Sequence, residues 1–388
     1  MTQAAWDNAK NILCVRLDTI GDVIMTTPAM RALKASQPER CITLLTSSAG
    51  SVVAPLISEL DDLIIYDSPW LKATAPRRDS SLEYEMIERL RQANFDAAVI
   101  FTVYSQNPLP SAFLCYMAGI PLRLAHCHEN PYQLLTDWVK DPEPDQFTRH
   151  EVRRQLDLVA SVGSEIADQR MSLQVPEVAQ TRVLQLLQEL NINLERPWIV
   201  IHPGATALSR RYPPEHFAIV ADQLVQRYGI PVIFTGTEPE QELIASIRQD
   251  MNAASHALVG CLDLGELTAL LDLAPLLISN NTGPVHIAAA VGTPVVDLYA
   301  LTNPQHTPWE VPNRVLFHDV PCRICYKSIC PEGHYHCLRL VKPETVVDAA
   351  LELLQSGQHG YCTGATVAIA PSFTQPLTAH PYPLLEIV

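Results

Sequence analysis

The sequence predicts an α/β protein made of two doubly wound halves. Three observations support this prediction: the chain has 388 residues, short apolar runs alternate with helical patterns, and the alternation begins again near residue 178. A chain of this length exceeds one ordinary domain core. Repeated β/α alternation is typical of parallel sheets covered by helices. We therefore expect two Rossmann-like domains.

The first half contains four strand-like runs and four helical patterns. The strands are predicted at 12–15, 41–45, 63–66 and 97–101, and the helices at 23–36, 52–57, 82–93 and 150–162. Pro28 should kink or restart the first helix. Because Gly163 and the Val175–Pro176 step follow the last helix, we place the boundary of this domain near residue 170, giving a domain of residues 1–170.

The second half repeats the alternation over residues 174–342. Strands are predicted at 198–201, 232–235, 276–279 and 294–299, and helices at 178–190, 215–228, 239–249, 265–273 and 284–291. A last helix is expected at 343–354. The remaining tail, 355–388, is rich in Pro, Thr and Ala, and we expect it to be partly disordered or to lie along the surface.

Composition excludes several classes of function. The formal net charge of −15 leaves no basic stripe for a nucleic-acid backbone. No run of about 18 apolar residues predicts a membrane span, and residues 1–11 lack the pattern of a signal peptide. We therefore expect a cytoplasmic protein that binds no nucleic acid.

Three loops of the second half carry unusual polar residues directly after a strand. Ligands of open α/β sheets bind at the carboxyl ends of the strands, so these loops should meet at one site. The residues that we select as donor-binding candidates are Thr206, Arg210, Arg211, Gly236, Glu240, Asn281, Thr282, Gly283 and His286.

The loop that ends in His286 suits a diphosphate. Thr282 or Gly283 can cap a helix that starts at Pro284, and a helix start offers free N–H groups and a positive dipole end. Arg210 and Arg211 would add positive charge in an otherwise acidic chain. A Gly-Pro pair before a helix is more often a simple turn, so only the three loops together favour a ligand site.

The loop after the first strand supplies a candidate base. Gly21 permits a tight turn from strand to helix, and Asp22 then lies at the start of the helix. Asp22 is either an N-cap or a general base that faces an acceptor hydroxyl. Arg16, Gly21 and Tyr104 are our candidates for the acceptor side. A dinucleotide fingerprint is absent, which disfavours a nicotinamide oxidoreductase.

These motifs resemble the heptosyltransferases of glycosyltransferase family nine. The resemblance rests on residues 15–17, 21–23 and 27–29, then 202–205, 210–213, 235–236 and 281–286, in the family's order. It implies a GT-B fold, in which two Rossmann-like domains face each other across a cleft, with the helix at 343–354 packing back on the first domain. It also implies inverting, metal-independent transfer, usually of heptose from ADP-heptose to a glycan or glycolipid such as lipopolysaccharide core, and therefore possible peripheral contact with the inner membrane.

The resemblance also assigns roles to residues. It implies that Asp22 is the catalytic base, that Arg210 binds the donor phosphates, and that Thr282, Gly283 and His286 bind phosphates and sugar. Glu240 or Glu238 would contact the nucleoside. One departure concerns Asn281, since the family usually has Asp there, and Asn loses the charge. This departure keeps a non-catalytic nucleotide-sugar binding protein, or a transferase with another donor or acceptor, open as alternatives.

Four of the ten cysteines form a cluster near the end of the second half. Cys322, Cys325, Cys330 and Cys337 lie within sixteen residues, with His334 and His336 beside them. Four thiolates are a common ligand set for structural zinc, although this spacing is not that of a standard zinc ribbon. The alternatives are reduced thiols or a local disulfide, and catalysis should need no cofactor.

Overall fold

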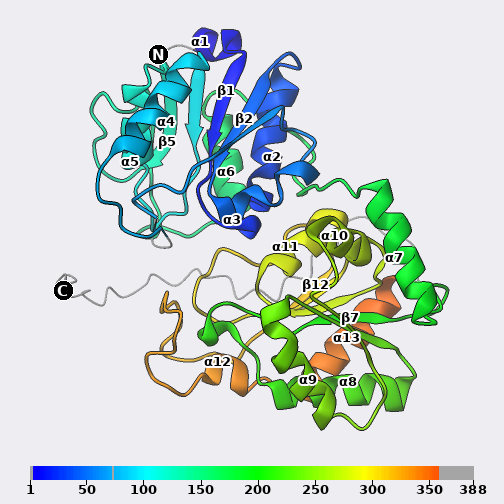
Figure 1. Cartoon of the computed structure of the whole chain (residues 1–388). Coiled ribbons are helices and arrows are strands. Elements are labelled where there is room, and N and C mark those ends of the chain that lie inside the picture. Colours follow the sequence, from blue (N-terminus) through cyan, green and yellow to red (C-terminus); the bar gives the residue numbers. More distant parts are fainter. Residues whose placement is uncertain (1–2, 72–73, 358–388) are drawn as a thin grey trace.

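The protein contains two six-stranded parallel sheets, one in each half of the chain (Figure 1). The computed structural model describes residues 3–71 and 74–357. All ten strand pairings within these residues are parallel. The prediction of two α/β domains is therefore confirmed.

The first sheet has the order β3-β2-β1-β4-β5-β6. Its strands are β1 (Asn11–Val15), β2 (Cys41–Thr46), β3 (Asp62–Ile65), β4 (Ala97–Ile100), β5 (Leu122–Cys127) and β6 (Asp137–Lys140). The central strands β1 and β4 are almost entirely buried and apolar, as expected for strands covered on both faces. Strands β5 and β6 were not predicted.

The helices of the first domain are α1 (Gln3–Asn8), α2 (Ile20–Ser36), α3 (Ser48–Ser51), η1 (Ala54–Leu56), α4 (Ser81–Gln92), α5 (Leu109–Met117) and α6 (Glu151–Ala160). The helix expected at 52–57 is wrong, because α3 and η1 occupy this region as two short turns. Helix α2 continues through Pro28. Proline has no N–H for the carbonyl of Ile24, and the Thr27 hydroxyl donates to that oxygen instead, at 2.8 Å.

The second sheet has the order β12-β11-β10-β7-β8-β9. Its strands are β7 (Ile199–His202), β8 (Val232–Gly236), β9 (His256–Val259), β10 (Leu277–Asn280), β11 (Val295–Leu298) and β12 (Asn313–Leu316). The helices are α7 (Glu177–Glu189), η2 (Leu208–Arg210), α8 (Pro214–Tyr228), η3 (Glu238–Glu240), α9 (Gln241–Asp250), α10 (Leu264–Leu273), α11 (Gly283–Val291), α12 (His336–Arg339) and α13 (Pro343–Gly357).

The last helix, α13, stays with the second domain, so its expected packing on the first domain is wrong. It lies against α8, β11 and β12 (Figure 1). Its apolar stripe, Val346, Val347, Ala350 and Leu353, is buried in the same core as β7 and α8. An apolar stripe at this spacing has to be buried, and here it packs on the face of the second sheet beside α8. Residues 358–388 of the expected tail lie outside the described residues.

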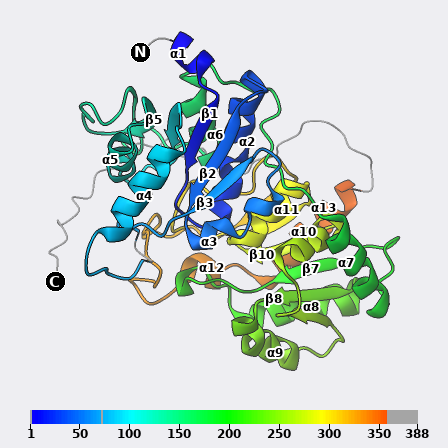
Figure 2. The ribbon, with the colours of Figure 1, turned by 45° about the horizontal axis from the view of Figure 1, so that its top comes forward.

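The two domains meet with α2 packed on α11 (Figure 2). The chain passes from α6 to α7 through residues 161–176, where Gln174 N–H donates to the Leu56 carbonyl at 2.7 Å. Farther along, Trp309 Nε1 donates to the Gln169 carbonyl at 2.8 Å. These contacts set the first domain directly above the loops of the second.

Candidate functional site

The topology places the predicted residues at the switch point of each sheet. In the first sheet the strand order reverses between β1 and β4, and in the second between β7 and β10. A crevice opens at the carboxyl ends of such strand pairs, and ligands bind there. Arg16 and Asp22 follow β1, Tyr104 follows β4, Arg210 follows β7 and His286 follows β10.

Arg16 is the centre of the first switch point. Its guanidinium is fully buried and pairs with Asp18 at 3.0 Å, Asp22 at 3.2 Å and Glu151 at 2.7 Å. Glu151 is also fully buried, and its Oε1 accepts a hydrogen bond from Gln155. A single arginine thus faces three carboxyl groups at the first switch point.

Asp22 is not the N-cap of α2, so one of its two predicted roles is wrong. Its Oδ2 accepts hydrogen bonds from Thr19 N and Thr19 Oγ1, which makes it the acid of a capping box whose N-cap is Thr19. Its Oδ1 faces Arg16, and the side chain keeps 16% of its surface exposed. Asp22 is therefore fixed in orientation while one edge remains open to a substrate.

The pKa values of the two aspartates move in opposite directions. Burial raises the pKa of Asp22, but Arg16, His306 and the Thr19 hydrogen bonds outweigh burial and lower that pKa to about 2. Burial dominates at Asp18 and raises its pKa to about 6, although Arg16 and Gln106 oppose it. Asp22 is thus ionised throughout the neutral range and can accept a proton.

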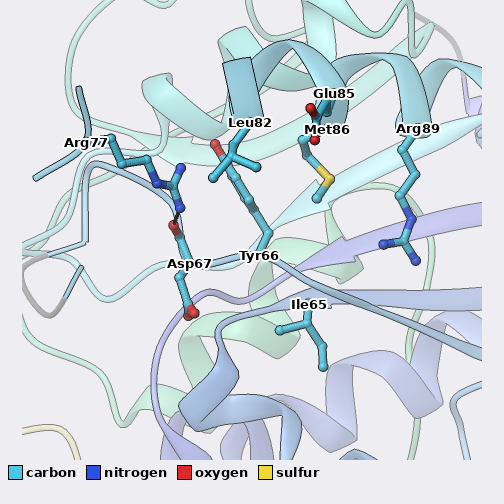
Figure 3. A pocket seen from close by; sticks show the side chains of 8 residues that line it. All are labelled: Ile65, Tyr66, Asp67, Arg77, Leu82, Glu85, Met86 and Arg89. Atoms are coloured by element: carbon cyan, nitrogen blue, oxygen red, sulfur yellow. Dashed lines mark hydrogen bonds between the residues drawn. The ribbon is translucent and has the colours of Figure 1, made fainter. Parts of the chain in front are cut away.

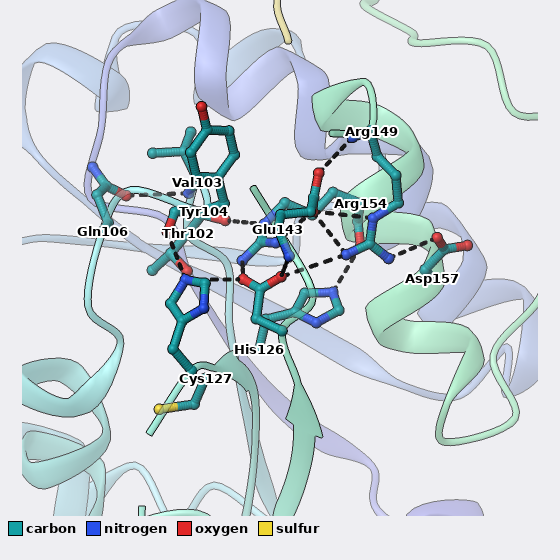
Figure 4. Close-up of polar contacts among 12 residues, drawn as sticks. Thr102, Val103, Tyr104, Gln106, His126, Cys127, Glu143, Arg149, Arg154 and Asp157 are labelled. Atoms are coloured by element: carbon teal, nitrogen blue, oxygen red, sulfur yellow. Dashed lines mark hydrogen bonds and ion pairs between the residues drawn. The ribbon is translucent and has the colours of Figure 1, made fainter. Parts of the chain in front are cut away.

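The loop after β4 forms the neighbouring wall (Figure 4). Gln106 Nε2 donates to Asp18 at 2.6 Å, and the Tyr104 carbonyl lies 3.0 Å from His128 Nε2. Beneath this loop, buried Arg154 donates to the Thr102 carbonyl and pairs with Glu143 at 2.7 Å. This buried network supports the loop after β4.

Asn280, at the end of β10, ties the two central loops of the second domain together. Its Nδ2 donates to the Pro203 carbonyl at 2.7 Å and its Oδ1 accepts from Tyr212 N–H at 2.9 Å. The two predicted arginines next to Tyr212 then differ. Arg211 is exposed and donates to the Ala205 carbonyl at 2.7 Å. Arg210 is half-buried, its N–H donates to the Ala207 carbonyl at 3.0 Å, and the described residues offer its guanidinium no hydrogen bond or ion pair.

Arg210 is therefore the arginine available to a ligand. Its charge lowers the pKa values of His286 and His306, after the larger effect of burial on both. Thr206, in the same loop, is exposed.

Glu240 lies against the loop after β7. A Cβ atom added to Gly204 would lie 1.7 Å from Glu240 Oε1, so glycine is required for this approach. Glu240 Oε2 accepts from Thr237 N at 2.7 Å and lies 3.9 Å from His202 Nε2. A Cβ atom added to Gly236 would lie 2.5 Å from Ile244 Cδ1 and 3.3 Å from the Glu240 side chain, so this position is also tightly packed. These residues form the β8 side of the second switch point.

The segment 281–286 faces the first domain. Thr282 is the N-cap of α11, Gly283 is its first residue and Gly292 ends it with φ 87°. A Cβ atom added to Gly21 would lie 2.7 Å from His286 Cδ2, so the imidazole rests on the turn that carries Asp22. Burial, and after it the charge of His306, lower the pKa of His286 to about 3, so this ring is neutral.

Four residues of this site were not predicted from the sequence. Asp18 and Glu151 pair with Arg16, His306 lies beside Asp22 and His286, and Asp297 contacts Asn281. Glu151 is 135 residues from Arg16 along the chain. The only signal for Asp18 was its place between Arg16 and Asp22 in the first loop, and the other three had none.

The four clustered cysteines line one cavity of about 20 Å³ together with His334. Cys322 Sγ lies 3.7 Å from His334 Nε2, and the cysteines are free thiols. Within residues 3–71 and 74–357 no three His, Cys, Asp or Glu side chains are arranged to hold a metal ion. The chemistry of the four thiols fits zinc, but their side chains would have to turn toward a common centre.

A larger cavity, of about 290 Å³, lies away from this site between β3 and α4 (Figure 3). Arg77 closes one side, held by Glu83 and the Asp67 carbonyl. None of the predicted site residues lines this cavity, and β3 is the edge strand of its sheet, so the switch points remain the candidate site. No helix in the described part of the chain is long and apolar enough to span a bilayer.

Comparison with known proteins agrees with this geometry. The model of glycosyltransferase family 9 (heptosyltransferase) matches residues 84–336, more than half of the chain. Lipopolysaccharide heptosyltransferase 2 of Escherichia coli K12 is 26% identical over 362 residues, covering 88% of this chain and 98% of that protein. Lipopolysaccharide heptosyltransferase 3 of Escherichia coli is 24% identical, covering 75% and 83%.

Solved structures of this family share the fold. The family 9 glycosyltransferase from Veillonella parvula superposes with a TM-score of 0.75 at 24% identity, covering 89% of this chain and 98% of that one. The ADP-heptose lipopolysaccharide heptosyltransferase II of Escherichia coli gives 0.69 at 24% identity, covering 90% and 99%. The two facing α/β domains are thus a GT-B fold. The chain belongs to glycosyltransferase family 9, the heptosyltransferase family, and is a glycosyltransferase.

Proposed function

We propose that this enzyme transfers a heptose, with inversion and without a metal ion, from ADP-heptose to a hydroxyl of a cell-surface glycan such as lipopolysaccharide core. The observation that carries the proposal is the approach of His286 to Gly21, which brings the Arg210–His286 set of one domain to the Asp22 carboxylate of the other. The names of the relatives support heptose and lipopolysaccharide. The proposed place of action is the cytoplasm, with peripheral contact with the membrane that holds the acceptor.

In the proposed reaction the acceptor hydroxyl attacks the anomeric carbon while Asp22 takes its proton. The bond from that carbon to the diphosphate breaks, and ADP leaves with an added negative charge. Arg210 and the N-terminal end of α11 would stabilise this charge. In the first turn of that helix Pro284 has no N–H and Val285 N–H donates to the Thr282 carbonyl at 3.0 Å, so the N–H of Gly283 would be the group offered to the ligand.

Calorimetric titration with ADP, GDP, UDP and the ADP-heptose epimers tests the donor site. We expect ADP and an ADP-heptose to bind, and Arg210→Ala to weaken both by about 10- to 100-fold, the cost of one charge-assisted contact. Arg211→Ala is the matched control, because Arg211 donates to the Ala205 carbonyl and should change affinity little. Wild-type protein that binds none of these nucleotides would rule out the donor site.

Transfer itself is tested with Asp22→Asn, which keeps the size of the side chain and removes its charge. We expect ADP-heptose affinity to stay near the wild-type value and kcat to fall by about 100-fold or more, the usual contribution of a general base. Asn281, where the family usually has Asp, favours a second candidate, a non-catalytic nucleotide-sugar binding protein. Wild-type protein that binds the donor but transfers no sugar to any lipopolysaccharide core fragment would establish that candidate.

Structural zinc at Cys322, Cys325, Cys330 and Cys337 is a separate proposal, supported by the single cavity that these thiols line. Zinc would hold the segment without entering the reaction. Elemental analysis of freshly purified protein should then give one zinc per chain, lost in a Cys330→Ser variant. Four titratable thiols in this segment with no bound metal would favour reduced cysteines.

A further inference from the structure

Asn281 is held by a buried carboxyl group on the adjacent strand. Strands β10 and β11 pair in parallel with Ser279 opposite Asp297, and Asn281 N–H continues the ladder to the Leu298 carbonyl at 3.2 Å. Side chains two residues apart on a strand share a face, so Asn281 lies on the same face as Asp297. Asn281 Nδ2 donates to Asp297 Oδ2 at 2.9 Å.

A second acceptor fixes the orientation of the same amide. Asn281 Nδ2 also donates to the His306 carbonyl, at 2.8 Å. Both hydrogens of the amide group are therefore directed to oxygens of the protein. The Oδ1 atom of Asn281 accepts no hydrogen bond from the described residues. A flipped amide would put this oxygen against two other acceptors, so the carbonyl oxygen is the atom left for a ligand.

Asp297 is unusual in its own surroundings. Its side chain is fully buried, and Oδ1 has no hydrogen-bond partner within the described part of the chain. Burial raises the pKa of this carboxyl group well above its usual range, and the hydrogen bond from Asn281 opposes this only in part. Burying an acid without hydrogen-bond partners costs stability. The hydrogen bond from Asn281 Nδ2 is the one that the structure shows for this carboxyl group.

The pair also connects to the proposed base. The loop that carries His306 contacts the first domain through two main-chain carbonyls. The Gln305 carbonyl accepts from Glu151 N–H at 3.1 Å, and the Thr307 carbonyl lies 2.8 Å from His150 Nε2. The Glu151 carboxylate in turn holds Arg16, which pairs with Asp22. The amide of Asn281 is thus connected to Asp22 by hydrogen bonds and ion pairs that the backbone at 305–306 and the Glu151 side chain join.

We propose that Asp297 is a positioning residue that orients Asn281 so that its neutral carbonyl oxygen accepts a hydrogen bond from a hydroxyl of the donor sugar. This proposal rests on the proposed function and deepens it, because it assigns the donor specificity to a pair of residues. On this view the carboxylate that the family usually has at position 281 has no place here. An acid at 281 would lack the two hydrogens that Asn281 Nδ2 now donates, to Asp297 Oδ2 at 2.9 Å and to the His306 carbonyl at 2.8 Å, and would leave that carbonyl facing another acceptor.

The test compares Asn281→Asp, Asp297→Asn and the double variant. We expect Asn281→Asp to lower kcat/KM for ADP-heptose about tenfold or more, because the His306 carbonyl would lose its donor and the side chain at 281 its fixed orientation. Asp297→Asn should raise KM for ADP-heptose several-fold, since Asn281 can then flip. Affinity for ADP alone, which lacks the sugar, should stay unchanged in both variants. The double variant re-forms an amide–carboxylate pair with its members exchanged and should recover part of the loss.

The outcomes separate this inference from the proposed function. Wild-type protein without ADP-heptose binding would refute the proposed function itself. An active wild type together with an Asn281→Asp variant of equal or higher kcat/KM would overturn the inference alone, because Asp297 would then not determine what position 281 accepts. Thermal unfolding of all variants completes the test. If Asp297→Asn lowers the melting temperature and weakens the affinities for ADP and ADP-heptose equally, Asp297 has a structural role only.

Discussion

Asp18 and Asp22 show how a single arginine can hold two carboxylates in different states. Both pair with Arg16, yet burial keeps the pKa of Asp18 at about 6, while Arg16, His306 and Thr19 overcome burial at Asp22 and bring its pKa to about 2. Relative to the ordinary value of 3.8, the folded state binds the Asp18 proton more tightly and the Asp22 proton less tightly. The two residues should therefore affect stability in opposite directions as pH changes.

We expect wild-type protein to gain stability relative to Asp18→Asn as pH falls from 7.5 to 4.5. The ionised Asp18 carboxylate destabilises the folded state fully above about pH 6, and protonation removes that cost as pH approaches the unfolded pKa. The gain should be no more than about 3 kcal/mol. Urea unfolding of both proteins at pH 7.5, 6 and 4.5 measures it, and a constant difference across these values would contradict the assigned pKa.

Asp22→Asn is the control for this measurement. Because the folded pKa of Asp22 is lowered, its stabilising contribution is present above about pH 4 and is lost only as pH falls toward 2. The charge of Asp22 also raises the pKa of Asp18, so the stability difference between wild type and this variant should change with pH in the same direction as for Asp18→Asn, but by less. A change as large as that of Asp18→Asn would show that a group other than Asp18 titrates.

At the level of elements, the segment 322–337, which carries the four clustered cysteines, supports the loop that carries Arg210. Ser209 N–H donates to the Ser328 carbonyl at 3.0 Å, and Ser209 Oγ donates to the Lys327 carbonyl at 2.7 Å. The same segment reaches the first domain, where the Tyr326 ring lies edge-on to Tyr104 with centroids 6.2 Å apart. The segment thus links the proposed donor loop to the proposed acceptor side.

Ser209→Ala should weaken ADP binding by about fivefold, because one of the two bonds that hold the Arg210 loop is lost. Calorimetry with ADP measures the change. Ser328→Ala is a matched control, since only its main-chain carbonyl takes part, and its affinity should equal that of wild type. If Ser209→Ala binds ADP as tightly as wild type, the segment does not position Arg210.

The elements that could be predicted from the sequence are those with a clear period. The buried strand β7 and the helices α7, α8 and α13 follow from apolar spacing alone. Strands β9 and β12, by contrast, are short and only half-buried, so no apolar run marks them. The packing of α13 could not be derived either, because an amphipathic stripe shows that a helix is covered and not which sheet covers it.

The candidate site was predictable only where its residues follow a strand in one short motif. Asp22, Arg210 and His286 lie in such motifs. Glu151, His306 and Asp297 depend on contacts between segments far apart in the chain, and nothing in their own sequence neighbourhood distinguishes a buried partner from an ordinary helix or loop residue. Long-range charge pairing, such as that of Glu151 with Arg16, therefore required the structure.

For the whole molecule, the decisive feature is how closely the two domains approach at Gly21. The imidazole of His286 fills the space that a side chain at position 21 would need, since a Cβ there would lie 2.7 Å from His286 Cδ2. Catalysis in the proposed reaction requires this approach, because the base and the donor site belong to different domains. Glycine within a helix otherwise costs stability relative to alanine.

Gly21→Ala should therefore lower activity more than stability. Alanine is the better helix former at the second residue of α2, but its methyl group must displace the buried His286 ring, so these two effects oppose each other and the melting temperature should change little. The displaced imidazole should lower kcat by about tenfold. ADP affinity should not change, because the nucleotide would be held by the second domain alone. Kinetics, calorimetry and thermal unfolding of this one variant make the test. Normal kcat would show that the approach of the domains at Gly21 is not needed for transfer, and weaker ADP binding would show that the first domain also holds the nucleotide.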